Sequence, residues 1–223
     1  MKAYKSGSTY SLHKETTSST STTTRTVISV SQASAVTKTV TLGAGTEGWI
    51  EIVGSGGAGT AGDVGWTVSG ASGGSGGRFS CNFVLSADTT FALTLGAQSS
   101  GGDGNASTLS INGTLVATAG GGTRGVAYYG PVGVGGTTTS NTSVSGITFS
   151  NVSNVNGNDG TKFDGGDWGS TAQGGASVAT SGTYGKGGNG NRNNTTINGD
   201  VGIIYLSVTK EIVTTTTWKA FNV

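Results

Sequence analysis

The chain has 223 residues, a formal net charge of +1, and 43 glycines against one proline, one cysteine and one histidine. Together with 28 Ser, 37 Thr and 14 Asn, the glycines fill more than half of the sequence, which excludes a large helical core. The scarcity of proline excludes collagen, the lack of basic runs excludes a protein that binds nucleic acid by neutralising phosphates, and one cysteine excludes a disulfide framework or zinc site. We expect neither a membrane span nor a secretory signal, because no apolar stretch is long enough.

The first 24 residues form a polar arm of low complexity, rich in Ser and Thr. Such a segment cannot bury enough apolar area by itself to offset the entropy lost on ordering. It is either an arm that becomes ordered against a partner or a flexible tail. We predict three parts in the chain: an N-terminal arm (1–24), a glycine-rich β-sandwich domain (25–213) with an excursion over 119–200, and a C-terminal extension (214–223).

Short segments with period-two alternation predict β-strands after this arm. Phe79, Cys81, Phe83 and Leu85 fall on one face of such a segment, so we expect Cys81 to be buried and inert. With this one there are about eight antiparallel strands, which predict an all-β fold of the sandwich or jelly-roll type. The other predicted strands are 25–31, 36–42, 49–53, 89–95, 201–213 and the two arms of a hairpin over 109–116.

The hairpin is predicted from Asn112-Gly113, because this dipeptide supplies the positive φ angles of a type I′ turn. A two-residue turn here pairs Ile111 with Thr114 and Leu109 with Val116.

Glycine recurs at every third position in four separate runs. Three residues per turn is the period of polyproline II, and glycine along one edge of such a helix lets neighbouring backbones approach closely enough to hydrogen-bond. The alternative is a flexible linker, in which short period-three runs arise by chance. Because the runs lie between well-patterned strands, we favour ordered, polyproline II-like packing. The runs are Gly56, Gly59, Gly62 and Gly65; Gly70, Gly73 and Gly76; Gly130, Gly133 and Gly136; and Gly182, Gly185 and Gly188.

The order of several motifs resembles the glycine-rich domain of bacteriophage tail proteins, over roughly residues 36–208. The resemblance rests on the order of the motifs, since no single one is diagnostic. The motifs are VTLGAG (40–45) followed by WIEIVGSGG (49–57), GGSGGRF (73–79) with FALTLGA (91–97), GGDGNAST (101–108), VATAGGG (116–122) and GIIYL (202–206).

This resemblance implies a place in a virion, in a tail fibre or a related appendage exposed to the extracellular medium. Tip adhesins of long tail fibres in T-even-like phages carry similar glycine-rich runs, packed as polyglycine II, with variable loops that contact the host. The chain departs from the family in lacking a long fibre shaft and in an excursion over 137–200 that is richer than usual in Asn, Ser and Thr.

Enzyme chemistry has little support in the sequence. His13 lies in the polar arm and Cys81 alternates inward with phenylalanines, so neither supplies a nucleophile–base pair. Asp159, Asp164 and Asp167 are open to two readings, as paired carboxylates for glycoside hydrolysis or, with neighbouring Asn side chains, as an incomplete calcium loop. We expect no enzymatic activity, no cofactor and no metal.

Several large aromatic residues occur in the polar, glycine-rich segments, with acidic residues close to them in sequence. Rigid aromatic side chains are efficient binding anchors, although they equally suit a small satellite core between segments that lack side chains. Adjacent aromatics in extended chain cannot both point inward, which favours exposure of Tyr128-Tyr129. The predicted receptor-binding residues are Tyr128, Tyr129, Asp164, Asp167, Trp168 and Tyr184.

The C-terminal extension continues past the last predicted sandwich strand with strong β-formers, including Trp218. An exposed extra strand that also carries Phe221 is an aggregation hazard unless it pairs with another chain. We therefore predict that Trp218 and Phe221 take part in assembly, as a homo-oligomer through the termini or with other virion proteins.

Two functions compete: a receptor-binding tail-fibre or tail-tip module, and a structural virion decoration or head/tail fibre protein without receptor binding. The first has a host cell-surface glycan or an outer-membrane protein as its partner, and neither involves nucleic acid. Ice binding through flat threonine arrays fits the glycine spacing, but not the aromatic loops.

Overall fold

The computed structural model describes the backbone of residues 12–21, 25–62, 70–126, 130–162, 172–190 and 196–220, with side chains between residues 25 and 210. Every regular element within these residues is a β-strand, so the predicted all-β fold is confirmed. The strands are β1 (Leu12–Ser21), β2 (Arg25–Val30), β3 (Val36–Leu42), β4 (Glu47–Val53), β5 (Arg78–Leu85), β6 (Thr89–Leu95), β7 (Ser107–Ile111), β8 (Thr114–Ala119), β9 (Thr138–Ser140), β10 (Ile147–Val155) and β11 (Ile203–Ala220).

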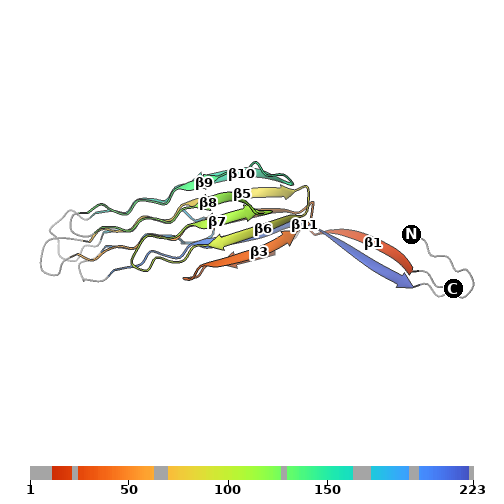
Figure 1. The fold of residues 1–223 in the computed structure, drawn as a ribbon, viewed down its shortest axis with the longest axis horizontal. Coiled ribbons are helices and arrows are strands. Elements are labelled where there is room, and N and C mark those ends of the chain that lie inside the picture. The colour runs from red at the N-terminus through yellow and green to blue at the C-terminus, as the bar shows by residue number, and fades with distance from the viewer. Residues whose placement is uncertain are drawn as a thin grey trace, which may run out of the picture.

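Two antiparallel sheets make up the sandwich (Figure 1). The first has the order β1-β11-β4-β5-β10, with β2 also paired to β11, and the second has the order β3-β6-β7-β8-β9. The described residues contain no helix that is long and apolar enough to cross a membrane.

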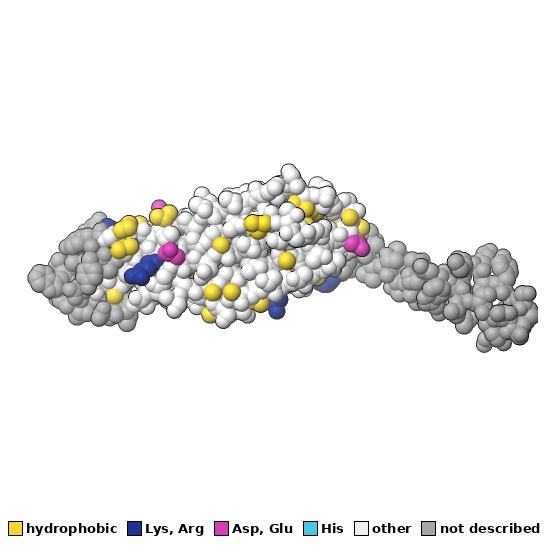
Figure 2. Space-filling model, viewed as in Figure 1, with side chains coloured by type: hydrophobic (Ala, Val, Ile, Leu, Met, Phe, Trp, Pro, Cys, Tyr) yellow, Lys and Arg dark blue, Asp and Glu magenta, His cyan; other side chains and the backbone are white. Residues whose placement is uncertain are grey.

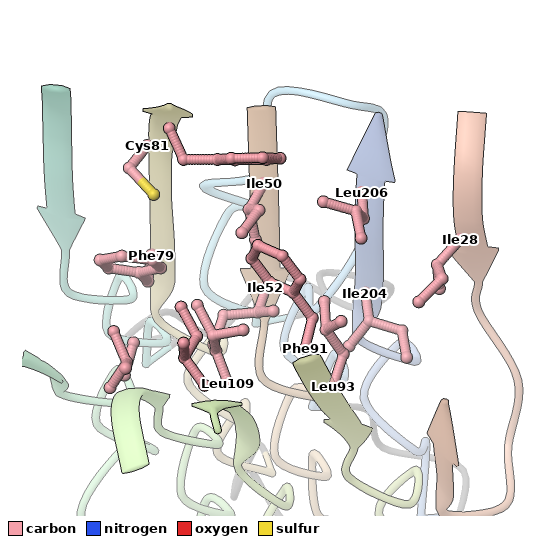
Figure 3. Packing of buried hydrophobic residues seen from close by; sticks show 14 of the residues in the cluster. Ile28, Ile50, Ile52, Phe79, Cys81, Phe91, Leu93, Leu109, Ile204 and Leu206 are labelled. Carbon is pink, nitrogen blue, oxygen red and sulfur yellow. The ribbon is translucent and has the colours of Figure 1, made fainter. Parts of the chain in front are cut away.

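The core lies between the two sheets, where their inward side chains meet (Figure 3). Phe83 of β5 and Phe91 of β6 are in contact across the two sheets, with ring centroids 5.1 Å apart. Cys81 is fully buried, as predicted, and burial raises the pKa of its thiol to about 12, which keeps it protonated and unreactive. The period-two alternation of β5 and β6 therefore identified the inward face correctly.

The predicted hairpin is present, but one of the two predicted residue pairs is wrong. Asn112 and Gly113 have φ angles of 49° and 81°, and Ile111 pairs with Thr114 as expected. Leu109, however, pairs with Ala117 rather than with Val116, because the register shifts between Leu109 and Ser110. This irregularity lets two consecutive residues, Val116 and Ala117, both be buried, which strict alternation forbids.

Three strands were not predicted. β9 and β10 lie inside the predicted excursion over 119–200, and β10 forms an edge of the first sheet beside β5. Its register shifts between Ser150 and Ser153, next to Asn151 with a φ of 51°, and its burial does not alternate regularly. The third, β1, lies in the polar arm and pairs with the end of β11, so the C-terminal extension has a partner strand within its own chain.

The glycine-rich segments run side by side away from the sandwich and hydrogen-bond to one another through their backbones (Figure 1). We call them the glycine bundle: residues 54–62, 70–77, 101–105, 120–126, 130–137, 156–162, 172–176, 185–190 and 196–202. Along residues 54–60, every third N–H donates to the same neighbouring segment. The donor–acceptor pairs are Gly54–Gly77, Gly57–Gly74 and Thr60–Ala71 toward 71–77, Ser55–Asn105 and Ala58–Gly102 toward 102–105, and Gly56–Asp200 and Gly59–Ile197 toward 197–200.

Residues 70–77 lie at the centre of the glycine bundle. Their N–H groups donate to the segments containing Gly188, Thr123 and Asn158, and their carbonyls accept from the segments containing Gly57, Gly133 and Gly175. Residues 54–60 and 70–77 are buried at every position, which favours ordered packing over a flexible linker. The lateral bonds have the three-residue period that the glycine spacing predicts, whereas the polyproline II backbone angles themselves stay a prediction.

Glycine is required where two backbones touch. A Cβ added to Gly74 would overlap the carbonyl of Val134 and the nitrogen of Gly135, whereas one added to Gly102 meets nothing within 4 Å. We predict that Gly74→Ala lowers the free energy of unfolding by about 1–3 kcal/mol, the usual cost of overpacking. Gly102→Ala, the matched control, is expected to change it by no more than about 0.5 kcal/mol. Thermal or urea unfolding of the two variants measures this difference, and equal stabilities would contradict close packing of the bundle.

Candidate functional site

Four pairs of bundle segments end at the same place, which we call the far end of the bundle (Figure 1). Each pair continues along the chain through residues that lie outside the described ones: 63–69, 127–129, 163–171 and 191–195. Backbone and side-chain hydrogen bonds tie the segments together close to these points. The bonds are Thr60 N to Ala71 O (2.9 Å), Gly125 N to Ala58 O (3.0 Å), Gly59 N to Ile197 O (2.8 Å), Gly190 N to Ala172 O (3.0 Å) and Ser72 Oγ to Thr161 O (2.8 Å).

Five of the predicted receptor-binding residues belong to two of these four connections, 127–129 and 163–171. Tyr128 and Tyr129 follow Val126 closely, and Asp164, Asp167 and Trp168 lie between Lys162 and Ala172; all five are outside the described residues. Because the chain is continuous, the described segments fix where each connection starts and stops. The described residues at which the connections start and stop therefore lie together at the far end of the bundle, although they are distant in sequence.

Tyr184, the sixth predicted residue, lies at the other end of the bundle. It is half-buried, and its backbone N–H and carbonyl both bond to the Ser177 hydroxyl, at 3.2 and 2.5 Å. The following Gly185 donates to Val201 (2.7 Å), two residues before β11 begins. The structure thus separates Tyr184 from the connections with which the sequence grouped it.

Glu51 holds the loop that contains Tyr184 against the first sheet. Its carboxylate, which is fully buried, accepts hydrogen bonds from the backbone N–H and the hydroxyl of Thr180 (2.7 and 2.6 Å) and from the N–H of Ser181 (3.0 Å). The sequence analysis missed this contact, because alternation along β4 puts Glu51 on the outward face and nothing in the sequence indicates that residues 180–181 cover it.

Acidic side chains elsewhere in the bundle also bind backbone N–H groups. Asp159 accepts from Gly135 N (2.8 Å) and Asp103 from Arg124 N (2.7 Å). Among the described residues no group of three or more His, Cys, Asp or Glu is placed to hold a metal ion. Burial raises the pKa of Asp200, an effect that the nearby Lys186 ammonium opposes.

An exposed patch borders the connection 127–129. Val126 and Val134 are 47% and 54% exposed, on adjacent segments joined by the Val126 N to Pro131 O bond (2.9 Å) and by the Thr123–Val134 pair. Arg124, Asp103 and Pro131 are exposed beside them. The visible face of the bundle carries hydrophobic and charged groups, whereas most of the sandwich surface is uncharged (Figure 2). The sequence gives no indication of this patch, because isolated valines in glycine-rich segments form no repeating pattern that would indicate which face they occupy.

No family model matches this sequence, and no curated protein is significantly similar to it. The described residues define the class of protein by their architecture alone: an antiparallel β-sandwich that carries a bundle of laterally hydrogen-bonded glycine-rich segments.

We predict that Glu51→Gln lowers the free energy of unfolding by about 1–3 kcal/mol, because glutamine has one acceptor oxygen and its buried amide NH₂ then faces an N–H or hydroxyl that has lost its bond. The matched control is Glu47→Gln on the same strand, where the carboxylate is 39% exposed and pairs with Lys210 at 2.7 Å. Its loss should cost at most about 1 kcal/mol. Chemical unfolding, with amide exchange at Thr180 and Ser181, measures both effects, and equal losses would argue against an anchoring role for Glu51.

Proposed function

We propose that the chain is a non-enzymatic structural protein of a bacteriophage virion, and that it acts as a receptor-binding module of a tail fibre or tail tip. The observation that carries the proposal is that the described residues flanking four connections lie together at the far end of the glycine bundle. A laterally bonded bundle is a rigid scaffold, and binding residues concentrate in loops held by such scaffolds.

The composition of the connections supports a binding role. They contain Tyr128, Tyr129 and Trp168, with Asp164 and Asp167 as hydrogen-bond acceptors. Aromatic faces cover apolar area at a low entropy cost and suit either sugar rings or protein loops. The partner that this chemistry fits is a glycan or an outer-membrane protein on the host surface.

The patch next to residues 127–129 extends this proposed site. Val126, Pro131 and Val134 add apolar area, and Arg124 beside Asp103 adds charge of both signs. We include these residues in the binding surface and leave out Tyr184, since it lies at the sandwich end of the bundle.

We predict that Trp168→Ala and Tyr129→Ala each weaken binding about thirtyfold, the effect of losing about 2 kcal/mol at an anchor, without a change in melting temperature. The probe is the full chain fused to a fluorescent protein, tested on a panel of bacterial strains and on surface glycan extracted from a strain that it labels.

Tyr184→Ala serves as the control, because its position far from the connections predicts unchanged binding. Labelling that survives both anchor substitutions would overturn the proposed site. Binding that falls only together with the melting temperature would favour a satellite core and a structural virion protein without receptor binding.

A further inference from the structure

β11 loses one of its neighbours halfway along its length. It pairs with β2 from Ile204 to Val208 and with β4 from Ile203 to Lys210, where, after a register shift, Lys210 lies opposite Glu47, the first residue of β4, and forms a salt bridge of 2.7 Å with it. From Glu211 to Ala220 its only partner among the described strands is β1. The two strands leave the sandwich as a ribbon (Figure 1). One edge of β11 over residues 211–220 is therefore left open by the strands that the structure describes.

A two-stranded ribbon is marginally stable in water by itself, and an open edge is a template for another strand. This ribbon is ten residue pairs long and contains no proline to block pairing. A third strand on the open edge of β11 would continue the ladder that β4 begins.

The sequence of the open edge is complementary to itself. Residues 211–219 read EIVTTTTWK, with Thr215 at the centre. In an antiparallel pair of two such strands centred on Thr215, Glu211 lies opposite Lys219 and Ile212 lies opposite Trp218. Opposite charges and apolar pairs directly across two strands are stabilising, and threonine pairs fill the middle.

A shift of one residue removes this complementarity. It places Ile212 opposite Lys219, or Glu211 opposite Trp218, and either change breaks the charge pair. In the centred register the paired segment ends at Lys219, because the next position lies opposite Lys210, where β4 already occupies the edge. The register is therefore defined both by side-chain chemistry and by the length of open edge.

We propose that residues 211–219 of β11 pair with the same residues of a second copy of this chain, about a two-fold axis at Thr215. The product is a four-stranded sheet of order β1-β11-β11-β1, an isologous interface in which each contact occurs twice. Antiparallel pairing places the two sandwiches at opposite ends of the shared sheet. The proposal does not depend on the receptor-binding role, since it concerns assembly alone.

Charge reversal tests the register. The full chain, measured by size-exclusion chromatography with light scattering, is expected to be a dimer. Glu211→Lys or Lys219→Glu alone creates two like-charge pairs per dimer and should raise the dissociation constant about tenfold or more. The double variant Glu211→Lys/Lys219→Glu restores both pairs and should recover dimerisation. Thermal melts of all variants verify that the sandwich is folded.

A cysteine on the two-fold axis tests the same register independently. Thr215→Cys places two thiols directly opposite each other, with Cα atoms about 4.5–5.5 Å apart, within the range of a disulfide. Thr214→Cys is the control, since its counterpart across the interface is Thr216. We expect a covalent dimer on mild oxidation for Thr215→Cys only.

A monomeric wild-type chain would overturn the proposal and leave the edge for a different virion protein. A double charge variant that stays monomeric, or equal cross-linking at positions 214 and 215, would overturn the register.

Discussion

The glycine bundle depends on one constraint, that peptide groups buried without side chains around them must bond to one another. At the centre of the bundle, residues 70–77 have neighbouring segments on all sides, and their N–H groups donate to three of them. The donor–acceptor pairs are Gly73–Gly188 and Gly76–Gly185, Gly74–Thr123 and Gly77–Gly120, and Ser75–Asn158. Burial of apolar side chains contributes little to the stability of the bundle, since many of its contacts are between backbones. The chain thus has two kinds of core: an ordinary apolar one in the sandwich, and a bundle whose order rests on hydrogen bonds at backbone contact distance.

The two cores are continuous, because the sandwich strands pass directly into the bundle. β4 and β5 make their last sheet pair at Val53 and Arg78, and Gly54 then donates to Gly77 at 3.0 Å. Gly77 in turn donates to Gly120, the residue after β8, which belongs to the other sheet. The apolar sandwich therefore sets the alignment of segments that have almost no side chains to align them. This explains how a glycine-rich sequence, which loses much conformational entropy on folding, reaches a defined packing.

The parts of the fold that could be predicted from the sequence are those in which residues of one type recur at a fixed spacing that matches the buried side of a strand or segment. The alternation of Phe79, Cys81 and Phe83 identified a core face, and the spacing of Gly70, Gly73 and Gly76 predicted the step of the lateral bonds. β10 was missed because an edge strand with a register shift is half exposed and does not alternate. Glu51 was missed for another reason. Its partners Thr180 and Ser181 lie about 130 residues further along the chain, and no local pattern encodes such a contact.

The glycines at backbone contacts and the proposed recognition residues are subject to different constraints. Positions such as Gly57, Gly73 and Gly122 cannot carry a side chain, because a Cβ there would overlap the backbone of another segment. The lateral bonds of the described segments join backbone groups, whereas the proposed function assigns recognition to the side chains of Tyr129 and Trp168, which lie outside the described residues. The proposed function thus assigns stability to the glycines of the described segments and recognition to residues of the connections. In such an arrangement the connections can change their chemistry while the scaffold that aligns them keeps its glycines.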